Sequence, residues 1–148
     1  MTGSITAAGT SLSISAGAPA TEDAAGYAAL TYTEIGQIEK LGALGASYSK
    51  IEFKPLKGPT QKHKGGIDYG SLQPSLAHDD SDAGQTLLRT ASDSNNLYAF
   101  KVVYPDGAIR YFRGRVFGYP ESVDGSESII MANPTVEIDT KVVKVAAP

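Results

Sequence analysis

The side chains most able to do chemistry in this chain are two histidines and a short acidic run. His63 and His78 lie in polar, turn-rich segments, where we expect both side chains at the surface. Neither belongs to an HExxH pattern or another metal-ligand spacing. The run Asp79-Asp80-Ser81-Asp82-Ala83-Gly84 is superficially similar to a calcium loop, but no glutamate closes it at the twelfth position. Helix capping explains these aspartates more simply. The chain also has no cysteine, which excludes thiol nucleophiles and zinc–cysteine sites. We therefore expect no enzyme activity, no metal site and no cofactor.

A second chemical possibility is a basic and aromatic platform for nucleic acid. Its members are Arg110, Arg113, Arg115, Tyr111, Phe112 and Phe117. Such residues stack on bases and contact phosphates. The chain is nevertheless acidic, with a formal net charge of −3, and it carries no RNA-recognition signature and no glycine-rich phosphate loop. We favour a structural use, in which the arginines pair with acidic strands of a neighbouring molecule.

The charged residues are segregated along the chain. Only acids occur before Lys40 and again in residues 116–140, whereas the cations gather between Lys50 and Arg115. One interpretation is a mixed, solvated surface. The other is that acidic faces of one copy meet basic faces of another, which favours ordered assembly over nonspecific association.

A β-hairpin over residues 97–118 must position the arginines. Tyr98, Phe100 and Val102 alternate with smaller or polar residues, which places them on one face of a strand. The Pro-Asp-Gly sequence that follows is typical of a tight turn. The return strand is again rich in aromatic and β-branched residues.

One short helix, at about Ala83–Ser92, is expected immediately before this hairpin. Ala83, Leu87, Leu88 and Ala91 recur at helical spacing. Asp82 and Gln85 fit a capping box at its start. Because the helix is short, its stability must come from packing Leu87 and Leu88 onto a sheet.

The remaining segments predict short strands and exposed loops. Residues 1–26 read as a flexible N-terminal arm with one strand at residues 11–15. The lysine- and glycine-rich residues 54–66 read as a long exposed loop, either the tip of a hairpin or a mobile loop. Residues 128–132, with three consecutive large apolar residues, read as a further strand. No apolar run approaches the ~20 residues of a membrane span. We expect residues 1–148 to form a single domain, mainly β (α+β), a sandwich or barrel with one short flanking helix.

The sequence of residues 84–118 resembles the tail tube proteins (major tail proteins) of lambda-like long-tailed bacteriophages, the siphophages. The matching residues are Gly84-Gln85, Leu87-Leu88, Tyr98-Ala99-Phe100-Lys101-Val102, Tyr104-Pro105-Asp106-Gly107 and Phe112-Arg113-Gly114.

The resemblance implies a structural virion protein with a tail-tube fold. Hexameric rings of it would stack into the tail tube, a conduit for delivery of the genome into the host. It would be assembled in the host cytoplasm and reside in the virion tail. Its partners would be further copies of itself, the tape measure protein, the tail terminator and the distal tail protein, without a membrane. Double-stranded DNA would pass through without specific binding.

A DNA conduit is hindered by a cationic lining, because each lysine or arginine that contacts phosphate adds affinity. We therefore expect an acidic or neutral lumen, with Glu34, Glu52, Asp68, Glu137 and Asp139 as the acids that face it. We expect the N-terminal arm and Lys54, Lys57, Lys62 and Lys64 to make the ring-to-ring contacts.

Two alternatives stay open. The chain could be another component with the tail-tube fold, a tail terminator or a distal tail protein. It could also be a non-assembling carbohydrate-binding β-sandwich, although it has no tryptophan for a sugar-stacking platform.

Overall fold

The hairpin expected over residues 97–118 is present and forms the centre of the fold. In the computed structural model, which describes residues 4–148, β8 (Tyr98–Val103) pairs antiparallel with β9 (Ile109–Gly118). The Gly107 amide donates to the Tyr104 carbonyl at 2.9 Å, and Gly107 has φ 96°. That left-handed conformation favours glycine, so the Pro-Asp-Gly turn forms as the sequence predicts.

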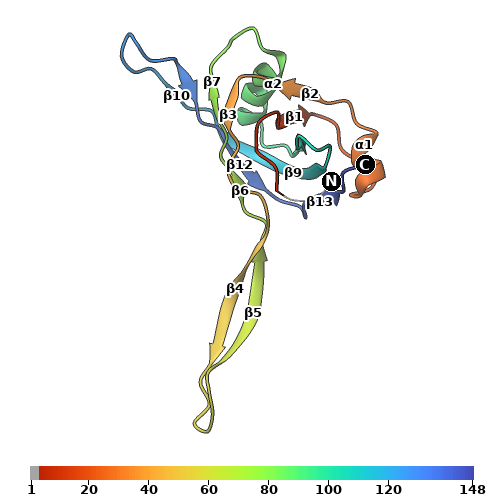
Figure 1. Cartoon of the computed structure of the whole chain (residues 1–148), viewed down its shortest axis with the longest axis vertical. Coiled ribbons are helices and arrows are strands. Elements are labelled where there is room, and N and C mark those ends of the chain that lie inside the picture. Colours follow the sequence, from red (N-terminus) through yellow and green to blue (C-terminus); the bar gives the residue numbers. More distant parts are fainter. Residues whose placement is uncertain (1–3) are drawn as a thin grey trace.

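The hairpin lies inside a seven-stranded antiparallel sheet in the order β2-β1-β8-β9-β12-β6, with β13 also paired to β9 (Figure 1). Its other strands are β1 (Ser11–Ser15), β2 (Thr33–Ile35), β6 (Ser71–Leu72), β12 (Thr135–Ile138) and β13 (Val143–Val145). The strand predicted at residues 11–15 is therefore confirmed. It is internal, since it pairs with β2 on one side and β8 on the other.

A second sheet has four short strands in the order β10-β11-β7-β3. Their bounds are β3 (Ile38–Lys40), β7 (Ser75–Ala77), β10 (Glu121–Ser122) and β11 (Met131–Ala132). Leu76 and Ala132 of this sheet share one buried core with Phe100 and Phe112 of the first sheet. The Phe100 and Phe112 rings stack with their centroids 5.3 Å apart. The expectation of a mainly β fold is confirmed.

The helix predicted at Ala83–Ser92 is also confirmed, with those bounds, as α2. The Asp82 carboxylate accepts a hydrogen bond from the Gln85 amide at 2.9 Å, so one half of the capping box forms. The other half does not form, because the Gln85 side chain turns inward and donates to the carbonyls of Gly36 and Ala77. The fully buried Leu88 packs the helix into the main core.

The expectation of a single helix is wrong, because a second, five-residue helix, α1 (Ala24–Ala28), lies in the predicted N-terminal arm. Asp23 caps it by accepting from the Gly26 amide at 2.8 Å. Tyr27 is fully buried and stacks on Tyr111 at 5.3 Å, on the sheet face opposite the main core. The arm's first three residues lie outside the described part of the chain.

No helix within residues 4–148 is both long and apolar enough to cross a membrane.

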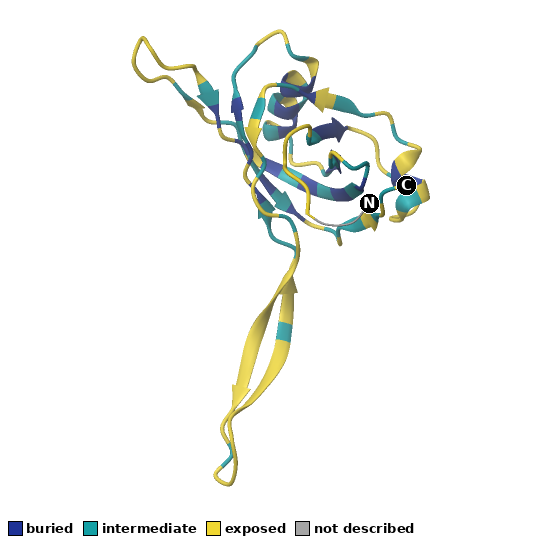
Figure 2. Cartoon of the chain, in the orientation of Figure 1, coloured by how far each residue is buried: buried dark blue, intermediate teal, exposed yellow. Residues whose placement is uncertain are grey.

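The long loop expected at residues 54–66 is shorter than predicted. β4 (Ser47–Phe53) and β5 (Gln61–Asp68) form a separate two-stranded hairpin, which leaves only residues 54–60 as its loop. The strand extends into a lysine- and glycine-rich segment because pairing uses backbone groups, which every residue except proline supplies in full. The predicted exposure is correct, since Figure 2 shows this hairpin almost entirely exposed.

Candidate functional site

The hairpin β4–β5 (residues 47–68) projects away from the two packed sheets (Figure 1). All seven residues of β4 are exposed, and so are seven of the eight residues of β5. A two-stranded hairpin is at best marginally stable in water when nothing packs against it. The geometry therefore presents a surface that is suited to being covered by another molecule.

The two faces of this hairpin differ in chemistry. The register pairs Glu52 with Lys62 and Lys50 with Lys64, which puts these four charged side chains on one face. The Lys50 ammonium lies 2.9 Å from the Glu52 carboxylate. The opposite face carries apolar side chains, of which Phe53 is 57% exposed.

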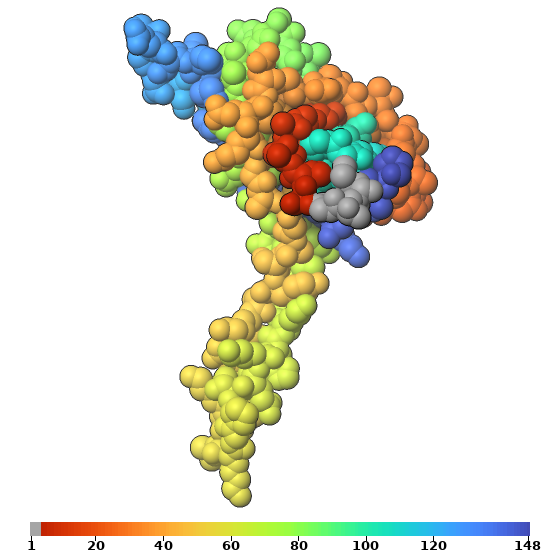
Figure 3. All heavy atoms as spheres, in the orientation of Figure 1, coloured from red at the N-terminus to blue at the C-terminus, as the bar shows by residue number. Residues whose placement is uncertain are grey.

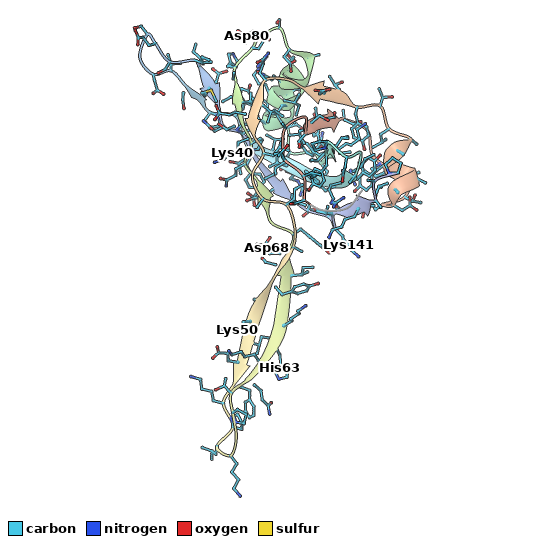
Figure 4. The ribbon with its side chains drawn as sticks, viewed as in Figure 1. Lys40, Lys50, His63, Asp68, Asp80 and Lys141 are labelled. Carbon is cyan, nitrogen blue, oxygen red and sulfur yellow. The ribbon has the colours of Figure 1, made fainter. Side chains whose placement is uncertain are left out.

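The structure brings the four predicted contact lysines together on the outer part of the hairpin. Lys54 and Lys57 lie in its loop, whereas Lys62 and Lys64 lie on β5 near His63 and across from Lys50 (Figure 4). No aspartate or glutamate occurs in residues 53–67. This tip (residues 53–64) is therefore a cationic surface interrupted by apolar side chains.

A second projection, which we call the acidic flap, consists of residues 119–130. It carries Glu121, Asp124 and Glu127 and no lysine or arginine. A strand was predicted at residues 128–132, but only Met131–Ala132 pairs, as β11. Ile129 and Ile130 consequently stay exposed, as does Val123 in the same flap. The Ile130 carbonyl accepts one backbone hydrogen bond from the His78 amide at 2.8 Å, but the pairing of β11 with β7 starts only at Met131.

The root of the acidic flap is fixed by a buried polar network. The Tyr119 hydroxyl donates to the Gln85 side-chain oxygen at 3.1 Å, and Gln85 is fully buried. The imidazole of His78 lies 3.3 Å from the Glu121 carboxylate and 2.8 Å from that of Asp80. His78 was expected at the surface, but only 13% of its side chain is exposed. These contacts tie the flap to α2.

The network at the flap root escaped the sequence analysis. Burial raises the pKa of the Tyr119 phenol, which keeps it neutral as a hydrogen-bond donor. Gln85 was recognised only as a capping residue, because sequence spacing does not show that a glutamine side chain turns inward. The one feature of the sequence that could have drawn attention to this segment was the acid-only composition of residues 116–140.

Three of the five predicted lumen acids lie on or next to strands of the seven-stranded sheet. Glu34 on β2 and Glu137 on β12 alternate with buried residues, so both point to the face opposite the main core. Asp139 follows β12, and its carboxylate lies 3.7 Å from the Arg115 guanidinium. Glu137 is also paired with Arg115 across the strands.

The other two acids lie on the projecting hairpin and not on this sheet face. Glu52 is on β4 beside Lys50, and Asp68 ends β5. The Asp68 carboxylate accepts from the Gly70 amide at 2.8 Å, where the chain turns back toward the sheet. The structure of one chain therefore does not bring all five acids together.

The proposed basic and aromatic platform is divided as well. Arg113 and Arg115 share the sheet face opposite the main core, whereas Phe112 points into that core. Arg110 lies over the Tyr104 ring at 4.9 Å. The Arg113 guanidinium lies 3.7 Å from the Glu22 carboxylate. These residues therefore offer no continuous platform for stacking bases.

Near α1, tyrosines cover part of this same sheet face. Tyr27 and Tyr32 both pack on Tyr111, with ring centroids 5.3 and 6.1 Å apart. Burial raises the pKa of all three phenols.

Within residues 4–148, no group of three or more His, Cys, Asp or Glu side chains could hold a metal ion.

Comparison with known proteins identifies the fold. The chain matches no protein-family model and no curated protein. It superimposes on a chain of the anti-feeding prophage (AFP) baseplate with a TM-score of 0.71 at 6% identity, covering 99% of both chains. For the PVC sheath/tube terminator in the extended state, from an extracellular contractile injection system, the TM-score is 0.66 at 12% identity, over 98% of this chain and 99% of the other.

A third match is a chain of the PVC sheath–tube complex in the extended state, with a TM-score of 0.62 at 12% identity, over 93% of this chain and 88% of the other. At these identities the likeness shows the fold and not the activity. The shared fold covers nearly the whole chain.

The tyrosine cluster predicts an alkaline loss of stability. Because the folded-state pKa values of these phenols are raised, their stabilising contribution is complete below the unfolded pKa of about 10 and is lost as the pH rises above it. Urea midpoints measured from pH 8 to pH 11 should fall less for Tyr111→Phe than for the unmodified protein. Tyr48→Phe, on the exposed hairpin, is the control and should follow the unmodified protein. An equal fall in all three proteins would contradict the prediction.

Proposed function

We propose that this protein is the subunit of a tail tube, in which hexameric rings stack to form a conduit for genome delivery by a long-tailed phage of the siphophage type. The observation that carries the proposal is the exposed hairpin β4–β5, in which seven residues of β4 pair with eight of β5 and all but one of them are exposed. Such a hairpin becomes stable when another molecule covers it.

The fold likeness supports this assignment. The solved structures with this fold belong to the baseplate of one particle and to the sheath/tube terminator and sheath–tube complex of another. A sequence that resembles siphophage tail tube proteins and a fold shared with chains of those assemblies agree on a structural, non-enzymatic part of a tail.

Ring formation also accounts for the strands at the sheet edges. β2 and β6 end the seven-stranded sheet, and they are only three and two residues long. Lateral pairing between neighbouring subunits would complete their backbone hydrogen bonds and remove the open edges. The proposed partners beyond the chain itself are the tape measure, terminator and distal tail proteins of the same virion tail.

We assign the sheet face opposite the main core to the lumen. Two of its cations lie beside acids, Arg115 near Asp139 and Arg113 near Glu22, whereas Lys101 lies over the Tyr32 ring. Glu34 and Glu137 contribute further negative charge. Such a lining would let double-stranded DNA pass without specific binding. The same role for Glu52 and Asp68 requires that the hairpin β4–β5 line the lumen as well.

A second candidate function is a tail terminator. The likeness to the PVC sheath/tube terminator, at a TM-score of 0.66, favours it. A terminator closes a tube as a ring, whereas a tube subunit forms a stack. Negative-stain microscopy of the purified protein separates the two, since long uniform tubes support the first function and isolated rings the second.

Shortening the hairpin should prevent stacking without unfolding the subunit. Replacing residues 51–63 by Asn-Gly leaves Lys50 next to Lys64, its neighbour in the register, across a two-residue turn. Because the hairpin lies outside the core, the melting temperature of this variant should be close to that of the unmodified protein. The variant should form no tubes in negative stain. Normal tubes from it would exclude the hairpin from ring-to-ring contact.

Reversing the charge of the proposed lumen face should make the tube retain DNA. Glu34→Lys with Glu137→Lys adds cations whose phosphate contacts raise affinity in a salt-dependent way. Purified variant tubes should co-sediment with linear double-stranded DNA at 50 mM salt and release it at 200 mM. Tubes with Glu34→Gln and Glu137→Gln are the control for charge loss without reversal. If the lysine tubes retain no more DNA than the control tubes, this face does not line the lumen.

A further inference from the structure

The exposed apolar side chains are concentrated on the two projections. Ten large hydrophobic side chains of the described residues are exposed, and eight of them lie on the hairpin β4–β5 or the acidic flap. The eight are Tyr48, Ile51, Phe53, Leu56, Ile67, Val123, Ile129 and Ile130. Apolar patches on projections are typical of surfaces that bind other proteins.

The same two projections carry opposite charge. The tip of the hairpin, residues 53–64, has four lysines, with Glu52 as the one acid beside it, across the strands from Lys62. The acidic flap has three acids and no lysine or arginine. Figure 1 shows them at opposite ends of the long axis of the molecule, and the space-filling view in Figure 3 shows both standing clear of the body. The molecule is therefore complementary to itself end to end.

This arrangement selects between two ways in which copies could associate. A contact of hairpin tip with hairpin tip, or of flap with flap, would bring like charges together. A head-to-tail contact brings opposite charges together. Because its two partners use different surfaces, such a contact leaves one tip and one flap free and can continue as a stack.

We propose that the hairpin tip of one copy docks onto the acidic flap of another copy of this chain. Leu56 at the tip packs against Val123 and Ile129, while Lys54 and Lys57 face Asp124 and Glu127. The proposal rests on the tube function and adds to it the surface that receives the hairpin. The apolar contact contributes most of the affinity, and the charges set the register.

The construction of the two surfaces supports this pairing. Strands rise about 3.3 Å per residue, so the seven residues of β4 carry the tip more than 20 Å from the body. The flap is held at its root by Tyr119, Gln85 and His78, which limits its freedom before binding. A receptor that is held in place loses less conformational entropy when it binds.

A charge exchange tests the pairing. Lys54→Glu with Lys57→Glu, and separately Asp124→Lys with Glu127→Lys, should each abolish tubes in negative stain. Combining all four substitutions in one chain should restore them. Lys141→Glu, an exposed lysine outside both projections, is the matched control and should leave assembly intact. Failure of the four-fold variant to regain tubes would overturn the pairing, while tubes from the unmodified protein would leave the proposed function standing.

Disulfide trapping tests the contact without requiring tubes. Because the chain has no cysteine, Leu56→Cys and Ile129→Cys each introduce a single thiol. When size-tagged versions are mixed and mildly oxidised, the mixed disulfide should be the predominant product. A predominant Leu56→Cys homodimer, or no crosslink at all, would overturn the pairing. A mixed disulfide without tubes would uphold it and contradict the tube function.

Discussion

Two strands cannot bury a hydrophobic face between them, and the hairpin β4–β5 is a pair of strands with solvent on both sides. Its backbone hydrogen bonds and its one cross-strand pair of opposite charge, Glu52 with Lys62, offset only part of the entropy of holding some twenty residues in order. The free energy that keeps it extended is therefore expected to come from another molecule. In the contact proposed above, a second copy supplies this free energy, and the cationic tip and the acidic flap are complementary surfaces for it.

The body of the protein provides a rigid base for these projections. The central hairpin β8–β9 is covered on one face by α2 and the second sheet and partly on the other by α1, which gives it two separate apolar contacts. Phe112 belongs to the first and Tyr111 to the second, although the two are adjacent in sequence. The flap is joined to this base through Gln85. Displacement of the root of the acidic flap would therefore require movement of the core.

Regular patterns made the central elements predictable, and tertiary contacts decided the rest. Alternation over Tyr98–Val103 and helical spacing over Ala83–Ser92 each correspond to an element with those bounds. The helix Ala24–Ala28 has no apolar stripe, and it depends on Tyr27 stacking against Tyr111, a residue 84 positions away. The candidate acids could be named from the sequence because their charge is visible there. Their separation between the sheet and the hairpin could not, because it depends on which strands pair.

Hydrogen exchange across a concentration series tests most directly whether the hairpin is completed by another copy. The amides of β4 and β5 should exchange rapidly in dilute, monomeric protein and become protected together with the acidic flap when the protein assembles, while β8 and β9 stay protected throughout. Protection of β4 and β5 already present in the monomer, or absent from the assembled protein, would contradict this account.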